Sequence, residues 1–374
     1  MDLSFTTEQQ MLRDSVQKFI EDNYDISQRK KLAESDEGFS RENWQQYAEL
    51  GWLAMPFAEE DGGIGGNAVD TMILMEEFGK GLVVEPFLPT VVMAGGAIAE
   101  FGTPEQKAEL LAGIIEGTLI ATVAYSEPQS HFELSDIQTR ATKDGDFYEL
   151  SGTKSVVPNA LSADKILVAA RTSGEGKAPD GITMFVVDRD AEGLSRQDYP
   201  TLDGLRASEV LLEKVRVPAA AVLGKVDQGM EVLTKISNRA ILALSAEAVG
   251  AMERLFEDTI AYTKQREQFD HPLSDFQVLK HRMTEMFMEH ALAKSLCMKA
   301  TMLETQGAAD TQRTIHALKY LIGKSARFVG QNAVQLHGGM GMTEDLRIAH
   351  YFKRLTIIDS QFGNTDHHLE RFVA

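Results

Sequence analysis

The sequence predicts an α+β protein in which a β-rich segment of about 100 residues lies between two helical regions. Apolar residues recur at helical spacing from Thr6 to about Gly117, and short β-rich runs separated by glycine turns follow. Long helical patterns return from Met230 to about Leu336. We therefore expect an N-terminal helical domain, a middle β domain and a C-terminal helical domain, with bounds near 1–118, 119–225 and 226–374.

The first region has two helix-start signals. Thr7 to Gln10 has the pattern of a capping box, and the apolar series that begins at Met11 follows it. Thr103 to Gln106 supplies an N-cap, a proline at the first helical position and a glutamine at the third. The glycine cluster from Asp61 to Gly66 follows no strand and lacks nucleotide-loop spacing, so we expect a turn between helices.

The middle region is a series of short β-rich runs, and glycine turns such as Asp144-Gly145 and Asp203-Gly204 separate them. This pattern is typical of a small antiparallel barrel or sandwich. Val217-Pro218 closes the region, and Gln228-Gly229 marks the junction with the last helices. The expected strands are Leu119–Tyr125, Phe147–Leu150, Lys165–Ala170, Ile182–Val187 and Glu209–Val217.

The composition is that of a globular protein and excludes several classes. A chain of 374 residues exceeds a usual single core, and its 43% hydrophobic content is close to average. The formal net charge of −19 disfavours nucleic acid as a partner, because a phosphate backbone requires a basic surface. Cys297 is the only cysteine, which excludes an internal disulfide and predicts a buried thiol.

The sequence contains no run of about 18 apolar residues that would cross a membrane. The N-terminal residues Met1 to Phe5 lack the basic and apolar regions of a secretory leader. We therefore expect a cytoplasmic protein without a membrane span.

Four separated segments occur in the order and approximate spacing of one protein family. They are Tyr125–Pro128, Gly204–Ser208 with Val215–Pro218, Arg266–Phe269, and Gln335–Gly341. Together they resemble the signatures of the acyl-CoA dehydrogenases, and the resemblance covers essentially the whole chain. It implies a helical N-terminal domain, a middle antiparallel β-barrel and a C-terminal helical bundle. Tyr47–Gly51 and Asn364–His368 are most similar to small subunits of pimeloyl-CoA dehydrogenases.

The resemblance implies bound FAD and oxidation of an acyl-CoA thioester to a trans-2-enoyl-CoA, with an electron-transfer flavoprotein as electron acceptor. A carboxylate base removes the weakly acidic α proton while the β hydrogen leaves as hydride to the flavin. The small-subunit resemblance adds fatty acid or dicarboxylic acid degradation, with dicarboxylyl or ring-derived CoA thioesters as substrates.

The resemblance also implies a cofactor shared between two subunits. The neighbour-facing half is present residue by residue, as Arg266, Phe269, Gln335, Gly338 and Gly339. The forked guanidinium of an arginine suits a diphosphate, and glycines let the backbone approach a cofactor closely.

The half that covers the flavin ring within one subunit has changed. Ser126 remains as a hydrogen-bonding partner for the flavin, but Val156 replaces a family tryptophan and Pro158 replaces a hydroxyl donor. The segment Gln129 to Leu134 lacks both glycines of the family loop.

Both positions at which the family places its catalytic base are empty. Gly363 stands where the glutamate of a Glu-Gly-Thr stretch is expected, and Ala240 and Ile241 occupy the second family position. Substitute carboxylates are Glu247, Asp366 and Asp359, each of which could instead be a cap or an ion-pair partner. His367 and His368 complete no metal-ligand spacing, so we expect no metal and place them at the surface or the cofactor edge.

Three hypotheses follow. The chain is the small subunit of a hetero-oligomer whose homologous large subunit supplies the base, or a self-sufficient homo-oligomeric enzyme with Glu247 or Asp366 as a displaced base. The third hypothesis is a non-catalytic structural subunit without flavin.

Overall fold

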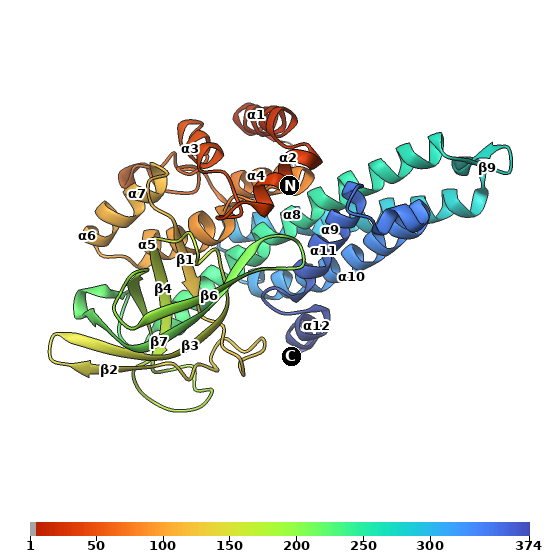
Figure 1. The fold of residues 1–374 in the computed structure, drawn as a ribbon. Helices are drawn as coiled ribbons and strands as arrows, with labels where there is room; N and C mark the ends of the chain where they lie inside the picture. The colour runs from red at the N-terminus through yellow and green to blue at the C-terminus, as the bar shows by residue number, and fades with distance from the viewer. Residues whose placement is uncertain (1–4) are drawn as a thin grey trace. The chain divides into compact units, whose positions relative to one another are not determined.

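A computed structural model describes residues 5–374 of the chain (Figure 1). The contacts divide the chain into two compact units. The first unit combines the chain up to Lys31 with Asn67–Val83 and Ile241–Ala374. The second unit comprises Leu32–Gly66 and Val84–Ala240.

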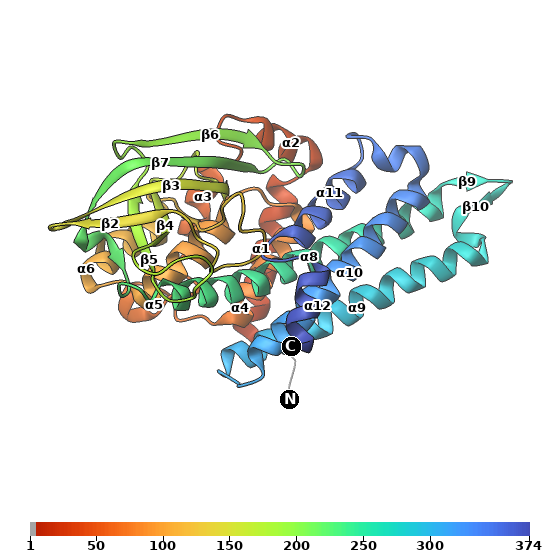
Figure 2. The same cartoon turned by 90° about the horizontal axis from the view of Figure 1, so that it is seen from below.

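The first unit is built from helices. Within it, α9, α11 and α12 pack on α10, and α1 packs on α4 (Figure 2). A short hairpin, β9 (Glu267–Gln268) and β10 (His271–Pro272), joins α8 to α9 through the 3-10 turn η5 (Leu273–Asp275). The long C-terminal helices expected from the sequence are confirmed. The helices are α1 (Thr7–Asn23), α2 (Ile26–Glu34), α4 (Ala68–Gly81), α8 (Gly229–Gln265, which begins in the second unit), α9 (Gln277–Thr305), α10 (Thr311–His337), α11 (Arg347–Ser360) and α12 (Thr365–Val373).

Helices α4 and α8 approach each other unusually closely. A Cβ atom at Gly79 would overlap the carbonyl oxygen of Glu247, and one at Gly250 would overlap that of Glu76. Glycine at both positions is therefore a packing requirement, because any side chain would push the two helices apart.

The capping box of α1 lies one residue earlier than expected. Thr6 Oγ1 accepts from Gln9 N (3.2 Å), and Gln9 Oε1 accepts from Thr6 N (3.1 Å). The assignment of the box to Thr7 and Gln10 was wrong because two overlapping Thr/Gln pairs satisfy the same spacing. The Gln9 amide also donates to Asp70 on α4 (3.1 Å), a tertiary contact that only the first register makes.

The helical part of the second unit is short and irregular. Thr103 begins a helix with a complete capping box, as expected. The glycine cluster after Asp61 is a loop, also as expected. Two π-helical segments, which periodicity did not predict, interrupt the α-helices. The elements are α3 (Arg41–Glu49), η1 (Glu59–Asp61), η2 (Leu88–Gly95, π), α5 (Gly96–Phe101), α6 (Pro104–Gln106), η3 (Lys107–Leu111, π), α7 (Ala112–Ile115) and η4 (Ala219–Ala221).

The sheet of the second unit contains all five expected strands and three more. The strands are β1 (Ala121–Ala124), β2 (Arg140–Asp144), β3 (Phe147–Pro158), β4 (Lys165–Arg171), β5 (Ile182–Asp188), β6 (Leu194–Pro200), β7 (Arg206–Pro218) and β8 (Val222–Leu223). Their order is β6-β7-β3-β2-β4-β5-β8, with β1 paired to β4.

The expectation of an antiparallel barrel was wrong. Among the described residues the sheet path ends at β6 and β8, and no pairing joins these two strands. The sheet is also mixed, because β4 pairs in parallel with both β1 and β2. Strand patterns in a sequence define which residues alternate, whereas closure depends on pairing between strands that are distant in the chain.

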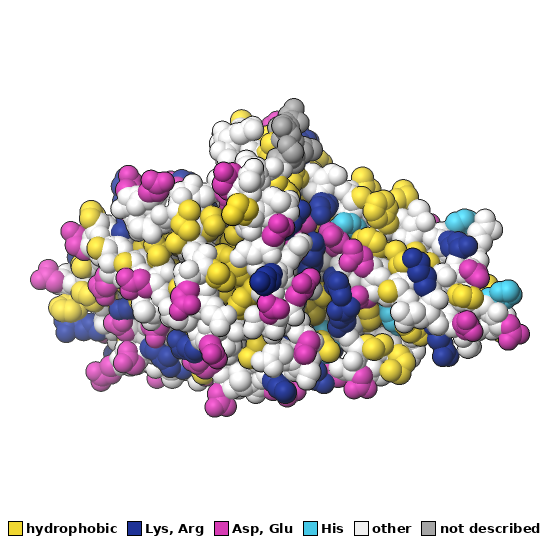
Figure 3. Space-filling model, turned by 90° about the horizontal axis from the view of Figure 1, so that it is seen from above, with side chains coloured by type: hydrophobic (Ala, Val, Ile, Leu, Met, Phe, Trp, Pro, Cys, Tyr) yellow, Lys and Arg dark blue, Asp and Glu magenta, His cyan; other side chains and the backbone are white. Residues whose placement is uncertain are grey.

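On the face drawn in Figure 3, acidic and basic side chains are interspersed rather than gathered into one patch of a single sign. No helix within residues 5–374 is long and apolar enough to span a membrane. Cys297 is a free, buried thiol, as expected.

Candidate active site

The neighbour-facing residues lie at the end of α8 and in the hairpin that follows it. Arg266 is exposed immediately after the last residue of α8. Phe269 occupies the tip of the β9–β10 hairpin with 85% of its surface exposed. Phe269 and Asp270 both have positive φ, 56° and 62°, as a two-residue hairpin loop requires. An exposed aromatic ring in this backbone region is costly for the chain alone, which is typical of a residue that serves a partner.

The glycine segment lies at the end of α10. Gly338 has φ 63° and ψ −149°, a backbone region that essentially only glycine adopts. A Cβ atom at Gly338 or Gly339 would meet no atom within 4 Å, so the surface here is open. Gln335 is exposed on the last turn of α10. The open surface at these glycines would let a cofactor approach the backbone and the Gln335 amide without an intervening side chain.

A ring stack brings the two neighbour-facing segments together. His337 is buried and stacks on Tyr262, with ring centroids 4.2 Å apart. Tyr262 lies one turn before Arg266, whose backbone N–H donates to the Tyr262 carbonyl (2.9 Å). His337 therefore joins the end of α10 to the end of α8, a link that the sequence did not identify.

On the flavin-covering side, an ion pair joins the end of β1 to β3. Lys154 Nζ donates to Glu127 Oε1 (2.6 Å), and both side chains are almost fully buried. Glu127 also accepts from Gln138 N (2.7 Å), Thr139 N (3.0 Å) and the Gln129 amide (2.9 Å). Burial acts to raise the pKa of Glu127, but the charge of Lys154 and these hydrogen bonds lower it to about 2. The carboxylate is therefore ionised, and its oxygens serve as acceptors for structural hydrogen bonds.

This pair fixes the two segments that carry Ser126 and Val156. Ser155 N donates to the Ser126 carbonyl (2.9 Å), so the end of β1 lies against a bulge in β3. Val156 lies in that bulge with φ 53° and 56% of its surface exposed. A β-branched residue at positive φ is rare and strained.

The strained Val156 amide has a specific partner. Its N–H donates to Glu209 (3.2 Å), which also accepts from the Tyr199 hydroxyl (2.8 Å). Pro158 follows without an N–H. This edge has no aromatic cover, and Pro158 stands where the family has a hydroxyl donor, so apart from Ser126 it offers little that fits a flavin ring. Glu209 and Tyr199 were not foreseen, because neither belongs to a motif.

Glu247 is paired inside the first unit. Its two carboxylate oxygens accept from Arg354 Nε (2.5 Å) and Nη2 (2.7 Å), and both residues are buried. A bidentate pair in this geometry is among the stronger interactions that a carboxylate makes. Proton abstraction by Glu247 would have to break it.

The remaining candidate carboxylates are placed differently. Asp359 accepts from the backbone N and the hydroxyl of Thr365 (3.1 and 2.7 Å) and pairs with Arg327 (2.9 Å). It therefore satisfies the backbone N–H of the first residue of α12, whose N-cap is Asn364. Asp366 is exposed in the first turn of α12, a favourable position for a negative charge.

The turn at Gly363 is held from two sides. Phe362 and Gly363 have consecutive positive φ values, 58° and 108°. The buried Lys319 Nζ donates to the carbonyl oxygens of Gly363 (2.8 Å), Ile358 (2.9 Å) and Asp359 (3.0 Å). The ring of His368 contacts the carbonyl of Phe362 through Nε2 (2.9 Å).

The expectation of a surface position was wrong for His368. Its side chain is buried, and its Nδ1 lies 3.0 Å from Nδ1 of His316 on α10. Burial lowers the pKa of His368 to about 3, so the ring is neutral at physiological pH. Within residues 5–374 no three His, Cys, Asp or Glu side chains are arranged to hold a metal ion.

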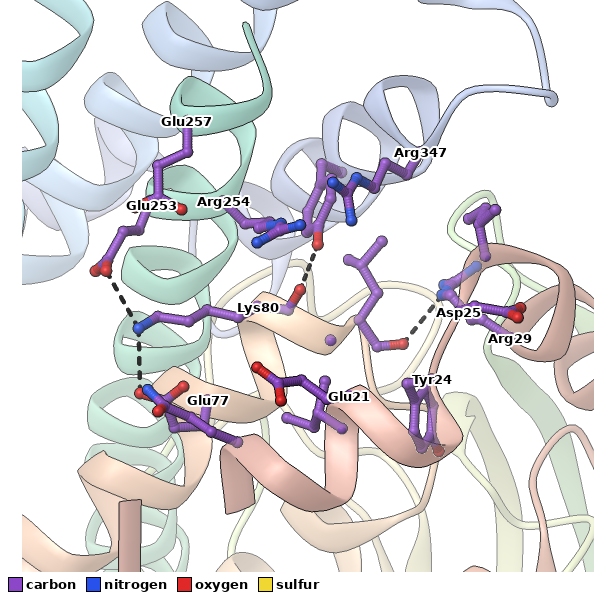
Figure 4. A pocket seen from close by; sticks show the side chains of 16 residues that line it. Glu21, Tyr24, Asp25, Arg29, Glu77, Lys80, Glu253, Arg254, Glu257 and Arg347 are labelled. Atoms are coloured by element: carbon purple, nitrogen blue, oxygen red, sulfur yellow. Dashed lines mark hydrogen bonds and ion pairs between the residues drawn. The ribbon is translucent and has the colours of Figure 1, made fainter. Parts of the chain in front are cut away.

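A pocket of about 530 Å³ lies in the first unit among α1, α2, α4, α8 and α11 (Figure 4). Lys80 donates there to Glu77 (3.1 Å) and pairs with Glu253 (3.2 Å). None of the site residues expected from the sequence lines this pocket. Its charged groups connect neighbouring helices, so we assign it a structural role.

Comparison with known proteins places the whole chain in one family. The model of the acyl-CoA dehydrogenase N-terminal domain matches residues 6–118, that of the middle domain 122–215 and that of the C-terminal domain 227–373. The probable acyl-CoA dehydrogenase YngJ of Bacillus subtilis is 30% identical, over 98% of this chain and 97% of its own length. The short-chain specific acyl-CoA dehydrogenase of Clostridium acetobutylicum is 29% identical, with the same coverage.

Solved structures agree with this assignment. Butyryl-CoA dehydrogenase from Megasphaera elsdenii superposes with a TM-score of 0.92 at 27% identity, covering 100% of this chain and 99% of that one. A variant of the Tcur3481-Tcur3483 steroid ACAD superposes with a TM-score of 0.88 at 30% identity, covering 98% and 96%. The protein therefore belongs to the acyl-CoA dehydrogenase family, whose members are FAD-dependent oxidoreductases that act on acyl-CoA thioesters.

Proposed function

We propose that this chain is the small subunit of a hetero-oligomeric acyl-CoA dehydrogenase, in which a homologous large subunit supplies the catalytic base and the contacts to the flavin ring. The observation that carries the proposal is the asymmetry between the two half-sites. Arg266 and the open glycines Gly338 and Gly339 remain suited to a partner's cofactor. On the other half, Val156 and Pro158 offer neither an aromatic cover nor a hydroxyl.

The residues of this chain would bind and orient the cofactor rather than transfer protons. The guanidinium of Arg266 would neutralise the diphosphate through paired hydrogen bonds. The backbone amides around Gly338 and Gly339 would approach the adenine side, and Phe269 would shield it from water. FAD, when bound, accepts the hydride that leaves the β carbon of the acyl group. The α proton would pass to the large subunit, because position 363 of this chain carries no side chain.

The carboxylates of this chain support the assignment of proton abstraction to the large subunit. Glu247 accepts two short hydrogen bonds from Arg354, and Asp359 accepts two from Thr365 at the start of α12. A general base must be able to reach the proton that it removes, with a pKa near the working pH. The name of the similar steroid ACAD joins two components, Tcur3481 and Tcur3483, which supports a hetero-oligomer of this type. It also supports bulky acyl groups, to which we add ring-derived and dicarboxylyl CoA thioesters.

The experiment compares the chain alone with the chain co-purified with its genomic neighbour, provided that this neighbour is a longer homologue. We expect little flavin and no turnover from the lone chain, and one FAD per pair with turnover from the complex. Full flavin occupancy and turnover by the lone chain would overturn the proposal.

A matched pair of variants then tests the neighbour-facing half. In the complex, Arg266→Ala should release FAD at least tenfold faster, since a charge-assisted contact of about 1.5–3 kcal/mol is lost. Arg313→Ala removes another exposed arginine, whose guanidinium lies over Phe372, and should leave flavin release unchanged. Equal effects of the two variants would remove Arg266 from the site.

A self-sufficient homo-oligomer with a displaced base is the second candidate. It predicts that Glu247→Gln or Asp366→Asn lowers the turnover of the active protein by about a hundredfold or more. A flavin-free structural subunit is the third candidate, and retention of FAD by Arg266 in the complex would exclude it.

A further inference from the structure

The turn that carries position 363 lies against two histidine rings. A Cβ atom built on Gly363 would lie 2.6 Å from Cδ2 of His367 and 2.7 Å from Nε2 of His368. Carbon and nitrogen atoms at such distances overlap, so any side chain would have to displace a ring. In the family this is the place from which the base extends, so the two rings, here called the imidazole pair, occupy the beginning of its path.

The ring of His368 cannot move aside without losing hydrogen bonds. A carbonyl oxygen only accepts, so Nε2 of His368 must carry a proton and donate it to the Phe362 carbonyl (2.9 Å). In the neutral ring Nδ1 is then an acceptor, and it receives the proton of His316 Nδ1 (3.0 Å). Nε2 of His316 in turn accepts from the Gln312 amide (3.1 Å). Every donor in this series has an acceptor, which defines one tautomer for each ring.

The other side of the turn is equally constrained. Lys319 extends from α10 and donates to the Gly363 carbonyl (2.8 Å), so the backbone cannot retreat from the rings without breaking this bond. The φ of 108° at Gly363 also lies in a region that residues with a Cβ rarely adopt. Three independent features, the rings, the lysine and the backbone conformation, therefore act against a side chain at this position.

We propose that the imidazole pair fills the space of the missing glutamate, so that the base-free form of this half-site is built into α10 and α12 and cannot be reversed by restoring the carboxylate alone. His316 and His368 are positioning residues that hold the turn, and His367 completes the filling. The inference rests on the proposed function in taking position 363 as that of the missing base.

The charged and titratable groups around the imidazole pair come from three elements. Helix α10 contributes His316 and Lys319, α11 contributes Asp359, and α12 contributes Arg371. Burial, together with the charge of Lys319, lowers the pKa of His368, which is consistent with the neutral tautomer that its hydrogen bonds require.

The first test measures thermal unfolding of the full chain alone. Gly363→Ala should lower the unfolding midpoint by several degrees more than Gly307→Ala. Gly307 is the matched control, since it also has a positive φ (59°) but a Cβ there would meet no atom within 4 Å. In the Gly363→Ala background, His367→Ala should recover part of the loss, whereas in the wild-type background it should not raise the midpoint. Equal midpoints for Gly363→Ala and Gly307→Ala would overturn the inference.

The second test uses the complex after the large subunit's own base has been changed to glutamine. Gly363→Glu in the small subunit should leave turnover at its residual level, and recovery to within tenfold of the unmodified complex would overturn the inference. The histidine tautomers provide a separate readout, because ¹⁵N chemical shifts should report a neutral, Nε2-protonated His368 from pH 5 to 8. Titration of that ring near pH 6.5 would contradict the hydrogen-bond series.

The small-subunit function and the filling of position 363 by the imidazole pair give separate outcomes in these experiments. If the lone chain binds FAD and turns over acyl-CoA, the proposed function is wrong even when the midpoints behave as expected. If Gly363→Ala is tolerated while flavin still requires the complex, the filling of position 363 is wrong and the small-subunit proposal stands.

Discussion

The buried pair between Lys154 and Glu127 allows a quantitative test of how the flavin-side edge is held. Replacing Lys154 with methionine keeps the unbranched apolar stem, one atom shorter, but leaves the Glu127 carboxylate without its cation. Removing one partner of a buried pair typically costs about 3–5 kcal/mol. Glu127 retains two backbone N–H donors and the Gln129 amide, so we expect the lower end, about 3 kcal/mol. For a unit of 150–250 residues this corresponds to a fall in Tm of about 6–12 °C.

The assay is urea denaturation of the full chain, followed by far-UV circular dichroism. Lys165→Met is the control, because Lys165 pairs with Asp188 at 2.6 Å in the same sheet, but the two side chains are 23% and 60% exposed. Exposed pairs contribute about 0–1 kcal/mol. The double variant Lys154→Met with Glu127→Gln should recover part of the loss, since no uncompensated charge remains. A loss below about 1 kcal/mol for Lys154→Met, or one equal to that of Lys165→Met, would refute the reasoning.

Three further perturbations test other parts of the site. Glu247→Gln should destabilise the chain by about 3 kcal/mol, because Arg354 stays buried without a counter-charge. The turnover of the complex should change less than tenfold. A hundredfold loss of turnover would instead identify Glu247 as a base. Acidification should weaken the fold through His368, whose pKa is about 3 in the folded chain and about 6.5 in the unfolded chain. As the pH falls below 6.5 the unfolded chain binds the proton first, so stability is lost progressively down to about pH 3. Paired urea titrations should show that the free energy of unfolding is about 2 kcal/mol lower at pH 5 than at pH 7, with a smaller difference in His368→Gln. Equal pH dependence of the two proteins would contradict this assignment. Asparagine tolerates positive φ better than phenylalanine, so Phe269→Asn should preserve the stability of the chain or raise it by up to about 1 kcal/mol. The same change should accelerate flavin loss from the complex. Unchanged flavin retention would show that the ring is dispensable.

The sequence was informative where local rules decide the structure. The long helices after Gly229, the capping box at Thr103 and the five expected strands follow from periodicity and turn residues over short spans. The buried thiol of Cys297 was also predicted, from a single cysteine within a helix-like run. The order of helical, β and helical regions then followed without any knowledge of contacts.

Periodicity and turn residues could not predict whether the sheet closes or where the backbone is irregular. The open path of the sheet depends on which strands pair, and the π-helical segments at Leu88–Gly95 and Lys107–Leu111 have no distinct sequence period. The positive φ of Val156 belongs to a bulge whose position is set by the pairing of β3 with β7. Each of these features is decided by neighbours outside the local segment.

The sequence by itself determined the family motifs, the order of the elements and the absence of a glutamate at position 363. The tertiary structure decided what the charged and titratable groups around those motifs do. Glu247 meets Arg354 across 107 positions of the chain, and His316 meets His368 across 52. The chemistry of a carboxylate or an imidazole depends on its burial and on its partner, and folding brings both from distant parts of the chain.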